Sequence, residues 1–145
     1  MNVSELKAEE LDTYLELLKE LDQENVLSHD EGLQLLEKIK RYPFYKIYYV
    51  RKEDEIIGTF SLIIIDNFGH GGKKLAILEN VVVNPDYKRM GIGKKLMEKA
   101  MDIAAKNDCY KLMLSSSENR KEAHAFYDSL NFKRHGVSFI TELIK

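Results

Sequence analysis

The chain has 145 residues, a length that fits a single domain over residues 1–145. Its composition is 44% hydrophobic and 32% charged, as in ordinary globular proteins, and a net charge of −2 excludes a global basic field for nucleic acid. No apolar run approaches the roughly 18 residues that a membrane helix needs. The N-terminus also shows no apolar signal region. We therefore expect a cytoplasmic protein that binds neither nucleic acid nor membrane.

The residues that could hold a metal are few and scattered. The single cysteine, Cys109, cannot form an internal disulfide, and the four histidines show no metal-ligand spacing. We expect no metal. Cys109 has no histidine beside it in the sequence, so a small buried residue is expected there and not a nucleophile.

Two helices are predicted first. Residues 6–22 place leucines at helical spacing, and residues 28–40 form a second helical segment. Ser28 followed by Glu31 is a capping box at the start of that segment, and Pro43 ends it. An antiparallel hairpin follows at residues 45–66, with "KEDE" as its turn.

The second half alternates strands and helices. "FGHGG" predicts a turn, and "KLAILENVVV" (74–83) a long apolar strand. A helix begins after the glycines at 91 and 93, a short strand lies at 110–115, a helix at 120–130 and a final strand at 137–144. This order predicts an α/β fold with an antiparallel first half and a parallel crossover in the second.

The turn before the third helix gathers positive charge. "NPDYKRMGIGKKL" holds two glycines and four cations: Lys88, Arg89, Lys94 and Lys95. Lysines in the first turn of a helix oppose the helix dipole, at a cost of about 0.3–1 kcal/mol each. The glycines let a ligand approach the unpaired amides of the helix start. We therefore interpret this glycine turn, residues 88–95, as a phosphate cradle, the alternative being an ordinary turn with a solvated basic face.

Two common phosphate motifs fit the glycine turn poorly. A Walker loop needs GxxxxGK[ST], which is absent. A dinucleotide fingerprint needs a third glycine where Leu96 stands, and the strands upstream predict a hairpin.

In the second half of the chain, "VVVNPDYKRMGIGKKLMEKA", "DCYKLMLSS" and "AHAFYDSLNF" resemble segments of the GNAT superfamily of acyl-CoA N-acyltransferases. The turn in "VVVNPDYKRMGIGKKLMEKA" is similar to the family signature Q/R-x-x-G-x-G/A, with Lys88 at the Q/R position. "DCYKLMLSS" and "AHAFYDSLNF" continue the likeness, with Asn131 in place of the usual glycine. The pattern is closest to members acting on small amines, such as glucosamine-phosphate and aminoalkylphosphonate acetyltransferases. The resemblance implies a mostly antiparallel mixed sheet flanked by helices, with splayed central strands.

The resemblance also implies a site for acetyl-CoA. The amides of the glycine turn would hold the coenzyme pyrophosphate, and the strand before it would bulge and pair with the pantetheine arm. Asn119 lies near a family asparagine that binds the coenzyme. The implied cofactor-binding residues are Val81, Val82, Val83, Lys88, Arg89, Met90, Gly91, Ile92, Gly93, Lys94, Lys95 and Asn119.

Acetyl transfer to an amine needs a base, and Glu79 is the candidate. It interrupts an apolar strand, where a carboxylate needs an explanation. The alternative is a residue that faces solvent or has a structural partner. The resemblance also implies that Tyr127 protonates the leaving thiolate, although helical spacing alone predicts a core tyrosine.

The predicted activity is an N-acetyltransferase that moves an acetyl group from acetyl-CoA to a primary amine of a small molecule, directly and in a ternary complex. A protein or peptide N-acetyltransferase, a non-catalytic acyl-CoA-binding module and an unrelated phosphate-binding domain are the alternatives. Ser115 stands where aminosugar-phosphate enzymes carry an aspartate, which argues against that particular substrate. A homodimer is possible.

Overall fold

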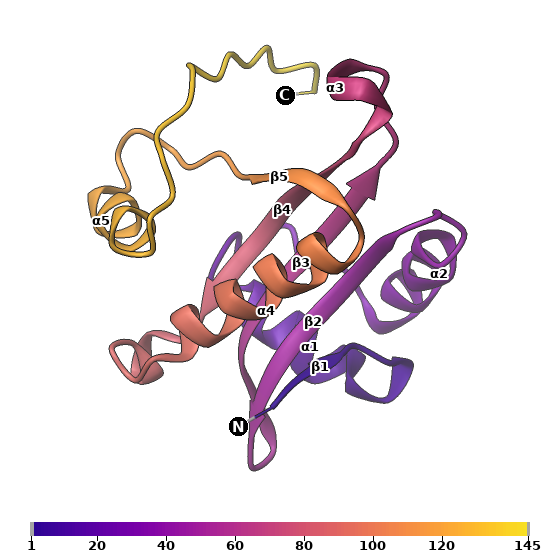
Figure 1. Cartoon of the computed structure of the whole chain (residues 1–145). Coiled ribbons are helices and arrows are strands. Elements are labelled where there is room, and N and C mark those ends of the chain that lie inside the picture. The colour runs from indigo at the N-terminus through magenta and orange to yellow at the C-terminus, as the bar shows by residue number, and fades with distance from the viewer. Residues whose placement is uncertain (1, 145) are drawn as a thin grey trace. The chain divides into compact units, whose positions relative to one another are not determined.

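The computed structural model describes residues 2–144, which divide after Met113 into two compact units. Figure 1 traces their elements along the chain. The single domain expected over residues 1–145 stays a prediction.

The first unit is built on a five-stranded mixed sheet with the order β1-β2-β3-β4-β5. The pairs β1–β2, β2–β3 and β3–β4 are antiparallel, and β4–β5 is parallel. The predicted α/β class and mostly antiparallel sheet are therefore confirmed. The strands are β1 (Val3–Glu5), β2 (Tyr45–Lys52), β3 (Glu55–Ile65), β4 (Lys74–Val83) and β5 (Cys109–Met113).

The second predicted helix begins at its predicted cap, whereas the first, expected over residues 6–22, is shorter and runs from Leu11 to Leu18. Ser28 caps α2 with the predicted capping box: its hydroxyl accepts from the Glu31 amide, and the Glu31 carboxylate accepts from the Ser28 amide. No helix in residues 2–144 combines the length and apolar composition that a bilayer crossing needs. The helices are η1 (Ala8–Glu10), α1 (Leu11–Leu18), α2 (His29–Ile39), α3 (Gly69–Gly72), η2 (Pro85–Tyr87) and α4 (Ile92–Lys106).

Helices α1 and α4 cover opposite faces of the sheet (Figure 1). On the α4 face, Gly58 of β3 lies against Ile92 and Leu96; a Cβ at Gly58 would come within 2.8 Å of Ile92. The missing side chain therefore lets α4 pack close to the strand. On the α1 face, a second cluster joins helix and strand side chains, including Leu15, Ile47 and Val82.

The second unit contains α5 (Lys121–Ser129) and a C-terminal segment. The final strand predicted at 137–144 is wrong, because these residues form no regular element. A strand needs a pairing partner, and no strand lies within the described part of this unit. The large apolar side chains of the segment are 78–92% exposed: Val137, Phe139, Ile140, Leu143 and Ile144.

Candidate active site

Strand β4 extends beyond the end of its neighbour β5. The two strands pair only where Lys74–Ile77 meets Cys109–Met113, while β4 continues to Val83. The last six residues of β4, from Leu78 on, therefore have no partner from β5. The predicted splay of the central strands stays a prediction, because β5 ends at Met113. Within the first unit, β5 leaves this edge of β4 open to another hydrogen-bonding group.

The free part of β4 also contains a bulge. Thr59 pairs with Val82 and Ser61 with Glu79, so two residues of β4 oppose the single residue between Thr59 and Ser61. One of them, Asn80, has a φ of 51°, in the left-handed region that asparagine tolerates better than most residues. The expected bulge in this strand is present.

The glycine turn opens the start of α4. Gly91 is the N-cap of this helix, with φ 80°, and it makes no side-chain capping bond. The first helix-closing bond runs from the Lys95 amide to the Gly91 carbonyl at 3.1 Å. The amides of Ile92, Gly93 and Lys94 thus precede any partner within the helix.

Space around Gly91 matches the interpretation as a cradle. A Cβ built on this residue would meet no atom within 4 Å. Four cations of the turn, Lys88, Arg89, Lys94 and Lys95, have exposed side chains. The Lys94 Nζ lies 3.9 Å from a Glu98 carboxylate oxygen, and the Lys94 side chain is 66% exposed. The residues present therefore fit a diphosphate on the backbone amides, with cations around it.

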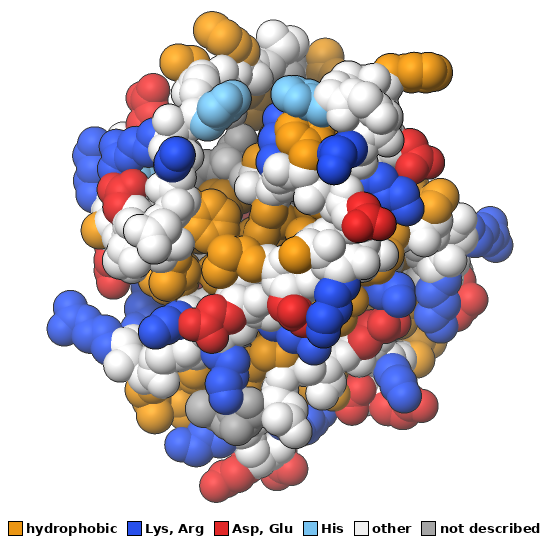
Figure 2. Space-filling model, viewed as in Figure 1, with side chains coloured by type: hydrophobic (Ala, Val, Ile, Leu, Met, Phe, Trp, Pro, Cys, Tyr) orange, Lys and Arg blue, Asp and Glu red, His pale blue; other side chains and the backbone are white. Residues whose placement is uncertain are grey.

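These cations are a local feature of the surface. Lys and Arg side chains are interspersed with Asp and Glu over the face of the molecule shown in Figure 2. That view shows no broad surface of one sign, in agreement with the net charge of −2.

Glu79 lies on the exposed part of β4, directly beside the bulge. Its carboxylate makes no ion pair within the described residues. An ion pair therefore does not explain why an acidic residue stands at this position of the strand. The valines that follow have mixed burial: Val82 is buried, and Val81 and Val83 are partly buried.

In the second unit, Tyr127 is half-buried on α5. Its ring lies 5.2 Å from Phe126 and 5.7 Å from Phe132. Burial raises the pKa of Tyr127, and the positive charge of Arg120 partly opposes this. A phenol in this environment stays protonated at neutral pH, as a proton donor must.

The helix that carries Tyr127 ends at a left-handed residue. Asn131 has a φ of 67°, and the Phe132 amide donates to the Tyr127 carbonyl at 3.1 Å. Asparagine thus serves in the place of the glycine of the family pattern. Asn119 is exposed before the helix, where its backbone amide donates to the Ser117 hydroxyl at 3.4 Å.

Three other reactive side chains have ordinary surroundings. Burial raises the pKa of the Cys109 thiol, which disfavours the thiolate that a nucleophile needs. His70 stacks on Tyr110 at 4.2 Å, and the ring of His124 lies 2.7 Å from the Ser117 carbonyl.

The sequence did not single out four polar residues in and around the part of the sheet that carries Glu79. Asn80 occupies the bulge, and Tyr14, Tyr45 and Ser61 belong to α1, β2 and β3. An asparagine inside an apolar strand is a signal for the bulge. The other three are spread over the chain, so only their strand register and helix packing reveal them.

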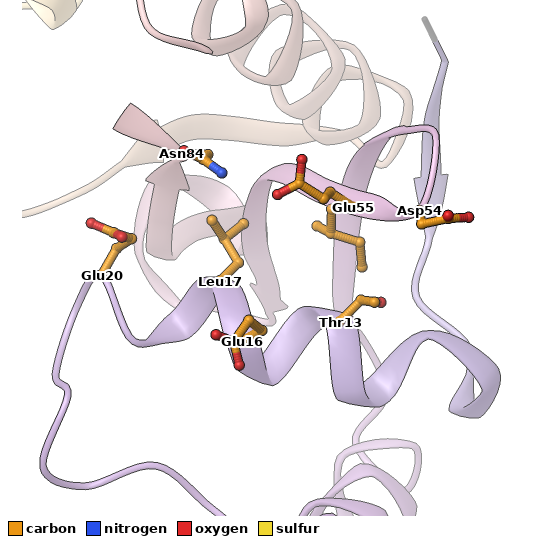
Figure 3. Close-up of a pocket in the computed structure, with 8 residues that line it drawn as sticks. Thr13, Glu16, Leu17, Glu20, Asp54, Glu55 and Asn84 are labelled. Atoms are coloured by element: carbon orange, nitrogen blue, oxygen red, sulfur yellow. The ribbon is translucent and has the colours of Figure 1, made fainter. Parts of the chain in front are cut away.

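A separate pocket of about 210 Å³ lies between α1 and the β2–β3 hairpin (Figure 3). Its acidic lining comes from Glu16, Glu20, Asp54 and Glu55. Neither Glu79 nor any residue of the glycine turn lines it, so it is distinct from the predicted site.

The mixed sheet, the end of β5 pairing after Ile77 and the open helix start together define an N-acyltransferase scaffold of the acyl-CoA class. Residues 10–132 match the profile of the acetyltransferase (GNAT) family. The chain therefore belongs to the acetyltransferase (GNAT) family.

Similar proteins agree with this assignment. The chain is 33% identical to a glucosamine 6-phosphate N-acetyltransferase of Trypanosoma brucei brucei over 131 residues, 90% of this chain and 87% of the relative. A crystal structure of a Trypanosoma brucei acetyltransferase superposes with a TM-score of 0.85 at 31% identity, covering 98% of this chain and 99% of that one. The glucosamine-6-phosphate N-acetyltransferase of Arabidopsis thaliana gives a TM-score of 0.90 at 24% identity, with 99% and 98% covered, which shows the shared fold. The predictions of the family and of an acetyl-CoA-dependent N-acetyltransferase are confirmed.

Proposed function

We propose that the acceptor is a primary amine of a small molecule, and that the glycine turn holds the pyrophosphate of acetyl-CoA. The observation that carries the binding site is the uncapped start of α4 beside the open Gly91. Backbone amides from Met90 to Lys94 would contact the phosphates. The Lys95 amide is already used in the helix, where it donates to the Gly91 carbonyl, so Lys95 would adjoin through its side chain, as would Lys88 and Arg89. Val81, Val82 and Val83 on the free edge of β4 would pair with the pantetheine arm, and Asn119 would add a contact.

Glu79 and Tyr127 would divide the proton transfers between them. Glu79 takes a proton from the ammonium group, directly or through water, because only the free amine is nucleophilic. As the new N–C bond forms and the C–S bond breaks, amides beside the Asn80 bulge stabilise the developing negative charge on oxygen. Tyr127 gives its proton to the leaving sulfur, and the acylated nitrogen returns its surplus proton to the Tyr127 phenolate as the amide forms. This scheme requires residues 1–145 to act as a single domain, and it needs neither a metal nor an acyl-enzyme on Cys109.

Glucosamine 6-phosphate is the first acceptor to test. The similarity over 90% of the chain to the trypanosomal enzyme supports it, although Ser115 replaces an acid of that enzyme type. Peptide amines and binding without catalysis are the competing possibilities.

The binding step is tested by thermal denaturation with acetyl-CoA, ATP or NAD. We expect acetyl-CoA alone to raise the midpoint, since only a ligand that binds the native state stabilises it. Thiol release from acetyl-CoA is then followed with amino sugars, aminophosphonates, polyamines, aminoglycosides and peptides. Equal stabilisation by all three nucleotides would contradict the coenzyme site, and turnover of peptides alone would contradict the small-molecule acceptor.

The variant Tyr127→Phe tests the proton donor. The substitution keeps the ring contacts with Phe126 and Phe132 and removes only the hydroxyl. We expect kcat to fall at least about tenfold, while stabilisation by acetyl-CoA is retained. Unchanged turnover would remove Tyr127 from the mechanism.

We also propose a cytoplasmic homodimer that binds neither nucleic acid nor membrane. Exposed side chains at 137–144, such as Phe139 and Leu143, favour self-association, because burying them removes apolar surface from water. Light scattering should give twice the mass of 16.9 kDa. The double variant Phe139→Ser, Leu143→Ser should give a monomer, and a monomeric wild type contradicts the dimer.

A further inference from the structure

Two hydroxyl side chains of the sheet, those of Tyr45 and Ser61, share the α1 face with Glu79, and Tyr14 of helix α1 approaches both of them. We call Tyr14, Tyr45 and Ser61 the hydroxyl cluster. Ser61 is the direct pairing partner of Glu79 on one side and of Ile47 on the other. Directly paired residues of antiparallel strands point to the same face, so Ser61 and Glu79 share the face that Ile47 presents to α1.

Tyr45 belongs to the same face, two residues along β2 from Ile47. Strand neighbours lie about 4.8 Å apart, so Tyr45 and Glu79 stand two strands apart, on either side of β3. Tyr45 pairs with Ile63, so it is offset from Glu79 by two residues along the strands, and long side chains are needed to meet across β3. Both Tyr45 and Glu79 have long side chains, whereas Ser61, directly opposite Glu79, is short. The long polar side chains of Tyr45 and Glu79 therefore lie around the short polar side chain of Ser61.

Ser61 has hydrogen-bonding capacity that the fold does not use. Its side chain is only 1% exposed, yet its hydroxyl has no hydrogen-bond partner within the described residues. Thr59, equally buried on the same face, shows the usual solution: its hydroxyl donates to the Tyr48 carbonyl at 2.7 Å. Folding alone therefore gives no reason to retain a hydroxyl at position 61.

Tyr14 and Tyr45 add two phenol groups to the cluster around Ser61. Burial raises the pKa of Tyr14 to about 12, and the nearby Ser61 hydroxyl acts in the opposite direction, although the two hydroxyls do not meet in hydrogen-bonding geometry. Burial, then the negative charge of Glu79, raises the pKa of Tyr45. The Tyr45 ring is held edge-on by Tyr42, at 5.7 Å and 73°.

We propose that the hydroxyl cluster is the acceptor subsite, in which Tyr45 contacts a hydroxyl on the carbon next to the reacting amine. This inference rests on the proposed acetyl transfer, and it names the acceptor class as a vicinal amino alcohol. Glu79 supplies the one negative charge for the ammonium group, and the neutral Tyr45 hydroxyl matches a neutral partner. Ser61 is a positioning residue, which orients that hydrogen bond from beneath.

The test compares two amines with wild type and Tyr45→Phe. D-Glucosamine 6-phosphate carries hydroxyls next to its amine carbon, and 2-aminoethylphosphonate carries none. In the variant we expect the KM for the amino sugar to rise about 3- to 10-fold, because one neutral hydrogen bond is lost. The KM for 2-aminoethylphosphonate and that for acetyl-CoA should stay unchanged.

Tyr48→Phe is the matched control. Tyr48 lies on the same strand but is 8% exposed on the opposite face, stacked on Phe60 at 5.1 Å. Its KM values should equal those of the wild type. Ser61→Ala should raise the KM for the amino sugar while its thermal midpoint stays equal or rises, because a buried unsatisfied hydroxyl is removed.

The outcomes separate this subsite from the proposed function. If both amines are acetylated and Tyr45→Phe behaves like Tyr48→Phe, the subsite is wrong and the acetyl transfer stands. A rise in KM for both amines in Tyr45→Phe also overturns the selection of a vicinal hydroxyl. If the wild type acetylates neither amine, although acetyl-CoA stabilises it, the acceptor class and the subsite both fail.

Discussion

The two faces of the central sheet differ in what they bury. On the α4 face, Phe60 and Leu62 of β3 are fully buried, as are Leu96 and Met97 of the helix. On the α1 face, the alternating residues of the same strand are Thr59 and Ser61, each 1% exposed and polar. The middle of β3 therefore supplies only apolar side chains to one face, and to the other two buried hydroxyls beside apolar side chains such as Ile47 and Val82. We call the α1 face the polar face for these two hydroxyls.

This difference locates the chemistry. The bulge at Asn80, the carboxylate of Glu79 and the hydroxyl cluster all belong to the polar side or to its edge. The apolar side holds β3 and β4 rigidly against α4, which fixes the positions of the polar groups above. Substitutions on the two faces should accordingly damage different properties.

The largest effect is expected from Phe60→Ala on the apolar face. Phe60 is 0% exposed and stacks on Tyr48, so the variant leaves a cavity in the core. The free energy of unfolding should fall by about 3–5 kcal/mol. Urea denaturation followed by circular dichroism measures this fall. Ser61→Ala, one residue away on the polar face, should change it by less than about 0.5 kcal/mol or stabilise the protein. Equal losses in both variants would contradict the division between the faces.

Glu79→Gln should have the next largest effect, and it should act on catalysis. The amide cannot accept the proton of the amine, so kcat/KM should fall about 100-fold, or about 2.7 kcal/mol. Unfolding free energy should change little, because Glu79 is exposed and makes no ion pair within residues 2–144.

The charge-matched control for this variant is Glu37→Gln. Glu37 is an exposed carboxylate on α2, 3.2 Å from Lys40, and it belongs to no strand of the sheet. Its removal should leave kcat/KM unchanged. If Glu79→Gln also retains full activity, the base must be sought elsewhere.

Much of the fold could be predicted from the sequence because its signals are local. The capping box at Ser28, the alternating hairpin strands and the glycines before α4 each depend on neighbours in the chain. The family signature lies in the same local segments, so the sequence alone was enough to propose the glycine turn, Glu79 and Tyr127 as site residues.

The remaining features depend on contacts between distant segments. Tyr45 and Ser61 come near Glu79 only through the register of three strands, and a shift of one residue would turn them to the other face. The failed prediction at 137–144 has the same origin. Its composition is typical of a strand, but a strand also requires a partner, which the described second unit does not contain.

The smallest effect is expected in the pH dependence of stability, to which two buried tyrosines, one on each face, contribute. Burial raises the pKa of both Tyr14 and Tyr48 from 10.0 to about 12. Above pH 10 the unfolded chain loses these protons while the folded chain keeps them, so the unfolded state binds fewer protons. Stability from each tyrosine is therefore fully present below pH 10 and is lost as the pH rises toward 12. The loss is at most about 1.4 kcal/mol per pH unit for each group.

Urea denaturation at several values between about pH 9 and pH 11.5 would measure this slope. Tyr14→Phe and Tyr48→Phe should each reduce it, and together they should remove most of it. The nearby Ser61 hydroxyl lowers the pKa of Tyr14 and has no counterpart at Tyr48. In a Ser61→Ala background the share of Tyr14 in the pH dependence of the unfolding free energy should therefore grow, while the share of Tyr48 stays the same. A change in the Tyr48 share instead would mean that the two faces are coupled, and the polar face could not then be altered independently of the core.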